Sequence, residues 1–194
     1  MTAETTATTL RVLTVPEVRV CCLRCEAEGR RYGTWVPLDE AEGVCTDAVH
    51  RGRVVTLTRD VDLHADAPTA ILETRNMPVS GPLNPALLAA WQALYEVVGA
   101  AQWPALLAWV GSGTHVEDGD GLPDAAAFAE SYAGIWGSFD EYAQELADET
   151  NLMDGWLETA RTYFDWSRWA RDLRYDYTVC DMPHGPGVYV FRDL

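Results

Sequence analysis

The stretch SFDEYAQELADET, residues 138–150, decides the fold of the second half of this sequence. Ser138 and Glu141 have the spacing of a capping box, in which the serine side chain accepts a hydrogen bond from the backbone N–H three residues on and the glutamate reaches back. Tyr142 and Leu146 follow at the spacing of one helix face. The stretch therefore predicts a helix that begins after Ser138 and turns these two side chains toward the core.

The other side of the same helix is strongly acidic. It carries five carboxylates about one helical turn apart, which are Asp140, Glu141, Glu145, Asp148 and Glu149. The stretch contains no Arg or Lys to offset their repulsion, which costs roughly 0.2–0.5 kcal/mol per pair. Such a row is typical of a solvated helix face. It would also suit a surface that imitates a phosphate backbone, since each DNA strand presents one phosphate about every 3.4 Å.

The excess of acid over base is concentrated in one part of the chain. The 194 residues include 30 Asp and Glu against 14 Lys and Arg, for a net charge of −16. Residues 117–181 hold 16 of these acids and only four arginines, which is three quarters of the net charge. Such a surface repels nucleic acid and anionic lipid and attracts basic protein surfaces. Solubility alone is the alternative explanation.

Outward from this stretch, the patterning predicts an α+β protein with three structured parts. The predicted divisions are a disordered tail at 1–16, an N-terminal α/β domain at 17–81, a central helical domain at 82–121 and a C-terminal acidic α+β domain at 122–194. The hydrophobic content of 48% is that of a globular protein rather than of a disordered acidic chain.

Local patterns predict the individual elements. Alternating apolar residues indicate strands at 17–23, 34–38, 54–57 and 69–73, and a terminal hairpin of 175–180 with 187–191. A turn is expected at 26–33. The expected helices are one from Pro85, capped by Asn84 and ended by Gly99, a second from Pro104, and others at 124–132, 155–164 and 166–173.

One C-x-x-C pair raises the possibility of a metal site. Cys22 and Cys25 form the pair, and Cys45 and His50 could complete a tetrahedral zinc site. A second close pair is missing, so small core cysteines are the favoured interpretation. We therefore expect no metal and no cofactor.

Catalytic patterns are equally weak. Asp118 and Asp120 resemble a fragment of a calcium loop whose other ligands are missing. The sequence has no H-E-x-x-H motif, P-loop or G-x-G-x-x-G motif. A non-catalytic protein is expected. A small metal-dependent enzyme, built on the cysteine pair or on the Asp118 loop, is an alternative.

Two further features bear on location and on the aromatic residues. Five cysteines, an N-terminus without a secretory pattern, and polar interruptions in the apolar stretch 85–110 predict a cytoplasmic protein. Eight Trp and eight Tyr are many for this length. Core packing is favoured over base stacking for four tryptophans that lie among carboxylates: Trp136, Trp156, Trp166 and Trp169.

The C-terminal third resembles the ArdA family of antirestriction proteins in blocks that occur in the family's order. The blocks are FAESYAGIWGSFDEYAQEL at 128–146, YFDW at 163–166, WARDL at 169–173, DYT at 176–178 and GVYVFR at 187–192. A looser N-terminal match comprises VCCL at 20–23 with Gly29, Gly33, Trp35 and Leu38. Residues 45–68 depart most from the family pattern, with more Arg and fewer acids.

The resemblance implies an elongated, three-domain homodimer that imitates bent B-form DNA. Such a protein occupies the DNA groove of type I restriction–modification enzymes, where it contacts the methyltransferase core with its specificity subunit. The matching acids with this implied role are Glu130, Asp140, Glu141, Glu145, Asp165, Asp172 and Asp176. The charge argument alone adds Asp148, Glu149, Asp154 and Glu158. An interaction protein with another basic partner, such as a nucleoid protein or a nuclease, is the alternative.

Overall fold

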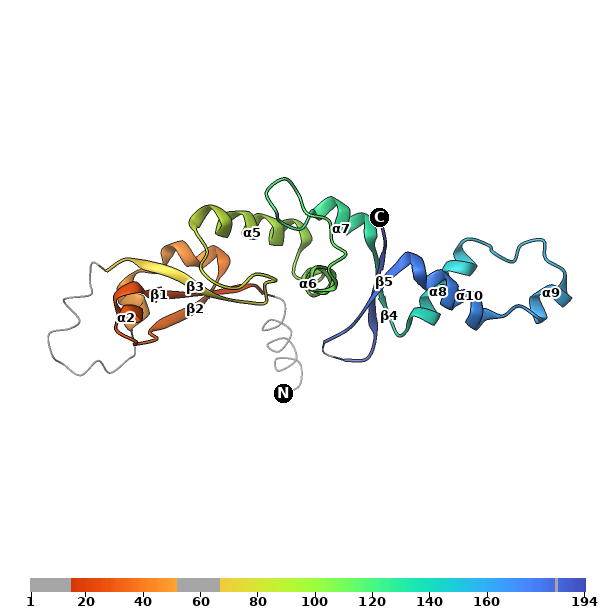
Figure 1. The fold of residues 1–194 in the computed structure, drawn as a ribbon, viewed down its shortest axis with the longest axis horizontal. Helices are drawn as coiled ribbons and strands as arrows, with labels where there is room; N and C mark the ends of the chain where they lie inside the picture. The colour runs from red at the N-terminus through yellow and green to blue at the C-terminus, as the bar shows by residue number, and fades with distance from the viewer. Residues whose placement is uncertain (1–14, 52–66, 184) are drawn as a thin grey trace. The chain divides into compact units, whose positions relative to one another are not determined.

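The computed structural model describes residues 15–51, 67–183 and 185–194 (Figure 1). Its contacts divide the chain into two compact units, 1–107 and 108–194, with the boundary inside helix α6 (Trp103–Ser112). Each unit contains a three-stranded antiparallel sheet and short helices, which confirms the predicted α+β class. The predicted strand at 54–57 and most of the predicted tail lie outside the described residues, and the three-domain division stays a prediction.

The sheet of the first unit has the strand order β2-β1-β3. Its strands are β1 (Glu17–Cys22), β2 (Gly33–Pro37) and β3 (Thr69–Arg75), close to the predicted bounds. The central strand β1 is buried along most of its length, with Val18 and Val20 in the core. The pairing of β1 with β3 shifts register between Arg19 and Val20.

Helices surround this sheet. They are α2 (Leu23–Ala27), the 3-10 helix η1 (Leu38–Gly43), α3 (Thr46–His50) and α5 (Pro85–Val98). The N-cap of α5 is confirmed, because the Asn84 side chain accepts a hydrogen bond from the N–H of Leu87. Gly99 ends that helix with a φ of 78°, a conformation that glycine adopts without strain.

The second unit holds the sheet β4-β6-β5. Its strands are β4 (Tyr132–Trp136), β5 (Tyr177–Asp181) and β6 (Val188–Arg192), and β5 and β6 form the predicted hairpin. Its helices are α7 (Ala125–Ser131), α8 (Phe139–Glu149), α9 (Glu158–Thr162), α10 (Trp166–Leu173) and the 3-10 helix η2 (Arg174–Asp176).

Three local predictions were wrong. Residues 23–27 form α2 directly after β1, where a strand end and a turn were expected. Tyr132 opens β4 and does not close the helix at 124–132, and the strand escaped prediction because its sequence, YAGIW, hardly alternates and contains a glycine at a φ of 107°. The helix expected at 155–164 is limited to the five residues of α9, none of which is buried.

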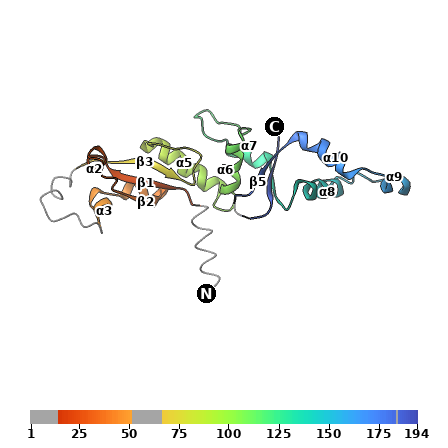
Figure 2. The ribbon, with the colours of Figure 1, turned by 60° about the horizontal axis from the view of Figure 1, so that its bottom comes forward.

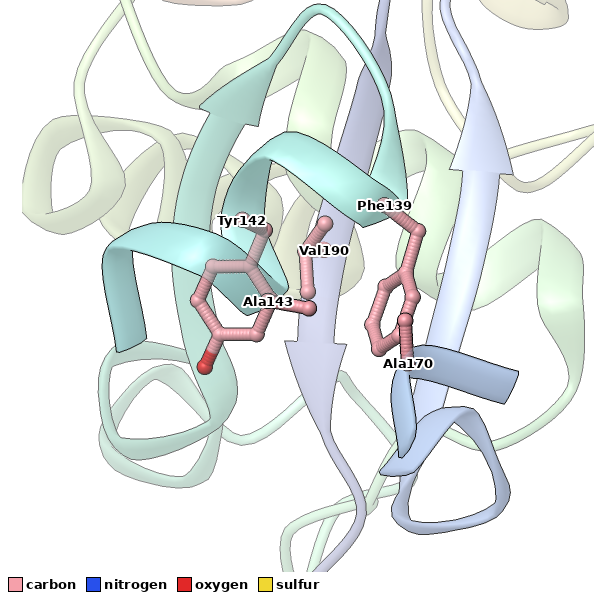
Figure 3. Close-up of a cluster of buried hydrophobic side chains, with 5 residues drawn as sticks. All are labelled: Phe139, Tyr142, Ala143, Ala170 and Val190. Atoms are coloured by element: carbon pink, nitrogen blue, oxygen red, sulfur yellow. The ribbon is translucent and has the colours of Figure 1, made fainter. Parts of the chain in front are cut away.

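The core of the second unit has two adjoining parts on β6. Phe191 is fully buried among aromatic rings, with its ring centre 5.6 Å from that of Tyr132 and 6.4 Å from that of Trp109. The second part is a cluster of Phe139, Tyr142 and Ala143 from α8 with Ala170 from α10 and Val190 from β6 (Figure 3). This cluster fixes α8 and α10 against the sheet.

Candidate protein-binding surface

Helix α8 begins with a capping box that differs slightly from the expected one. The Ser138 hydroxyl accepts a hydrogen bond from the N–H of Glu141 at 3.2 Å, as predicted. The Glu141 carboxylate accepts one from the N–H of Gly137 at 2.9 Å, one residue before the serine. The start of α8 is therefore held from both sides.

All five carboxylates of α8 are exposed. The buried side chains of this helix are Phe139, Tyr142, Ala143 and Ala147, and Leu146 is half-buried, so the predicted inward face is confirmed. At 3.6 residues per turn, the carboxylates all fall within about half of the helix circumference. They leave one side of α8 wholly acidic, apart from Gln144.

Two of these carboxylates lie at the end of α8 where the helix dipole disfavours negative charge. Asp148 and Glu149 lie in the last turn of α8, which contains no basic residue. The negative end of the helix dipole repels carboxylates there, at a cost of about 0.3–1 kcal/mol each. Stability alone would favour Lys or Arg at these positions.

The other six predicted carboxylates are also exposed. They occur at the end of α7, in the segment after α8, and along α9, α10 and η2, and they are Glu130, Asp154, Glu158, Asp165, Asp172 and Asp176. Thus every one of the eleven acids proposed from the sequence faces solvent. Whether they form one continuous ribbon stays a prediction.

Arginine neutralises little of this surface. Asp172 forms ion pairs with Arg171 at 3.1 Å and with Arg168 at 3.9 Å. Among the described residues, the other ten carboxylates have no cation within ion-pair distance.

The remaining arginines of the second unit interact with other groups. Arg161 donates a hydrogen bond to the backbone carbonyl of Met153, and the Arg174 guanidinium lies 5.7 Å from the centre of the Phe139 ring. Arg192 interacts with the Tyr177 and Tyr142 hydroxyls, and this contact raises the pKa of its guanidinium. These arrangements leave the carboxylates free to attract an external cation.

In the first unit, by contrast, arginines form ion pairs with glutamates. Arg19 is buried and contacts Glu26 at 3.0 Å and Glu73 at 2.9 Å, and Arg31 also pairs with Glu73. Burial tends to raise the pKa of the Glu73 carboxyl, but its contacts with these two arginines prevail and lower it. Here the charges stabilise the local fold instead of remaining available.

The four tryptophans are not all core residues. Trp136 packs against the core cluster. Trp169 packs against it as well, and together with Trp156 and Trp166 it surrounds Phe164, with ring centres between 4.9 and 6.2 Å from that ring. Trp156 is exposed, so core packing is wrong for this residue.

The possible metal ligands separate into those that the fold gathers and those that it does not. Cys22, Cys25 and His50 lie together, with ligand atoms within 4.8 Å of one another. Cys45 is exposed at the N-cap of α3 and is outside this group, so the four-residue zinc set was wrong in that member. The Asp118 carboxylate accepts hydrogen bonds from the N–H groups of Asp120 and Leu122, and no described metal-ligand group includes it.

Two substitutions of Asp165 separate the effect of its charge from the effect of its capping hydrogen bond. Its carboxylate accepts a hydrogen bond from the N–H of Arg168 and so caps α10. We expect Asp165→Ala to lower the free energy of unfolding by about 1 kcal/mol, because this N–H loses its partner. Asp165→Asn should change it by only a few tenths of a kcal/mol, since an amide oxygen caps equally well. Urea denaturation of the two variants measures the difference, and equal losses would contradict the capping role.

Fold and surface together define an acidic α+β protein with an exposed and mostly unpaired set of carboxylates, suited to a basic partner. Among the described residues, no helix is both long and apolar enough to cross a membrane. The antirestriction protein (ArdA) family model matches residues 18–187, and no curated protein matches the chain. The chain belongs to the ArdA family, and its function is therefore antirestriction.

Proposed function

We propose that the chain is a non-catalytic DNA mimic that inhibits type I restriction–modification enzymes from the DNA-binding groove. The mimic surface consists of the eleven carboxylates named above, with α8 at its centre. The partner is the methyltransferase core with its specificity subunit, and the inhibitor acts in the cytoplasm as a homodimer. Inhibition of modification along with restriction would follow from the same contact.

One observation carries the proposal: ten of the eleven acids are exposed without an ion-pair partner among the described residues. A groove that holds DNA presents cations to phosphates, and α8 offers it five carboxylates over about 13.5 Å of helix axis. Cations of the groove relieve the repulsion within α8. The proposed complex thereby gains electrostatic energy that the free protein lacks.

A cleavage assay tests this function directly. Purified type I enzyme is incubated with unmethylated target DNA and increasing inhibitor, and the uncleaved fraction is measured. We expect full protection at a stoichiometric excess, and a matching loss of enzyme–DNA complex in a gel-shift assay. Full cleavage at saturating inhibitor would contradict the proposal. Capture of a nucleoid protein or a nuclease in its place would support another basic partner.

The proposed binding should weaken steeply with salt. Each carboxylate that binds a cation of the groove displaces counterions, as each phosphate of DNA does. The logarithm of the association constant K should therefore fall linearly with the logarithm of the salt concentration. If six or more of the carboxylates make such contacts, affinity falls about a thousandfold or more between about 50 mM and 200 mM salt. Calorimetric titration of inhibitor into enzyme at four salt concentrations measures the slope. A slope near zero would mean that apolar contacts drive the association.

A further inference from the structure

We propose that Cys22, Cys25 and His50 form a zinc-binding site in the first unit. Cys22 is the last residue of β1 and Cys25 lies in α2, so the strand-to-helix corner presents both sulfurs on one side. His50 is the last residue of α3, which contacts β1 and β2 (Figure 2). Three soft or borderline donors from two separate segments therefore converge on one point.

The distances suit zinc. The Cys25 sulfur lies 3.2 Å from Nε2 of His50, and all three ligand atoms are within 4.8 Å of one another. Bonds of about 2.3 Å to sulfur and about 2.0 Å to nitrogen in a tetrahedron place neighbouring ligand atoms about 3.5–3.8 Å apart. The group thus needs shifts of no more than about 1 Å to close on an ion.

The surroundings suit a metal as well. Cys22 and Cys25 are buried, and the Tyr32 ring packs edge-on against the imidazole of His50, with ring centres 6.2 Å apart. Two thiolates balance the charge of one Zn²⁺, so the bound site is neutral and compatible with burial. The three residues leave one coordination position for a water molecule or another exchangeable ligand. The ion would join α3 to the corner between β1 and α2.

The obvious alternative is a redox C-x-x-C pair. A reactive thiolate of that kind is partly exposed and lies near cations or a helix N-terminus. Cys22 lies at the N-terminus of α2, but both thiols are buried, and the imidazole contacts the Cys25 sulfur through its Nε2 atom. These features favour coordination over disulfide exchange.

Metal analysis of the full chain tests the site. The protein is purified without a polyhistidine tag or chelator, zinc is quantified by mass spectrometry, and Zn²⁺ alone is titrated against a chromophoric chelator. We expect one zinc per chain, and a Kd at least about a hundredfold weaker in Cys25→Ser and His50→Gln. Cys45→Ser and Cys180→Ser are the matched controls and should bind like the wild type. Substoichiometric zinc with no tight binding in the titration would overturn the proposal, as would an unchanged Kd in His50→Gln.

Two further measurements distinguish the loss of a metal ligand from misfolding of the variant. Co²⁺ in place of zinc should give a thiolate charge-transfer band in the wild type and in Cys45→Ser, and a band of at most about half that intensity in Cys25→Ser, which keeps one thiolate. Because a metal that binds only the folded state stabilises it, a hundredfold excess over Kd should raise Tm by about 5 °C or more. His50 is half-buried at a helix end, so His50→Gln should fold and show no such rise. Recovery of a Cys22–Cys25 disulfide from reducing conditions would refute coordination.

Discussion

The variant that carries Asp140→Asn, Glu141→Gln, Glu145→Gln, Asp148→Asn and Glu149→Gln is expected to lose at least about a thousandfold in inhibitory potency at about 0.1 M salt. Each contact that releases a counterion contributes about 0.9 to the slope of log K against log salt. Five such contacts account for about 4.5 orders of magnitude between about 1 M and 0.1 M salt. The slope itself should become shallower by about 4.5, which calorimetric titration at several salt concentrations measures.

This substitution should leave the fold intact. The Glu141→Gln amide oxygen can still accept the hydrogen bond from the N–H of Gly137, so the N-terminal cap is kept. Near that end, the loss of charge at positions 140 and 141 removes a favourable dipole interaction. Removal of the charges of Asp148 and Glu149 at the other end relieves an unfavourable one of similar size. Urea denaturation should therefore give a free energy of unfolding close to that of the wild type.

A matched control separates the position of the charge from its amount. The first unit offers five exposed acids without an ion pair among the described residues, which are Asp39, Glu40, Glu42, Asp47 and Glu96. Their amide variant changes the net charge by the same amount and should keep most of the inhibitory potency. Equal losses in the two variants would mean that net charge alone determines inhibition. Full potency in a folded α8 variant would remove that helix from the binding surface.

The sequence predicts those elements whose signals are local. Asn84 with Pro85 and Ser138 with Glu141 mark helix starts, because a cap side chain and the N–H it bonds are only three residues apart. The hairpin of β5 and β6 is equally local. By contrast, β4 is short and joins the sheet by pairing with β6, some fifty residues away, so pairing and not propensity makes it a strand.

The sequence predicted that the acids of the candidate surface are exposed, but it did not predict that most of them lack an ion-pair partner. Solvent-facing carboxylates follow from helical periodicity, which is why the acids of α8 could be placed. That Arg174 lies over a Phe139 ring, or that Arg161 bonds a carbonyl, depends on tertiary packing. The metal-ligand group shows the same limit, since only the packing of α3 brings His50 to the cysteine pair and leaves Cys45 outside.

Phe191→Ala is expected to lower the free energy of unfolding by about 3–5 kcal/mol. The phenyl ring is fully buried on the central strand β6 and contacts the rings of Trp109, Phe128 and Tyr132. Its removal leaves a cavity in the layer that supports β4 and α7. Since a protein of this size is stable by about 5–15 kcal/mol, the loss is a large part of the total. Urea denaturation measures it, and Tyr175→Ala, which truncates a ring that is 82% exposed, is the control with an expected change within about 0.5 kcal/mol.

The same variant tests whether mimicry needs a fixed shape. Phe191→Ala keeps every carboxylate and the net charge, so a simple polyanion effect would survive unfolding. If the acids must be held at helical spacing, inhibitory potency should fall in step with the folded fraction as urea or temperature rises, while Tyr175→Ala follows the wild type. Protection assays across the unfolding transition decide between the two. Undiminished inhibition by the unfolded chain would show that charge density, and not the geometry of α8, is what the enzyme binds.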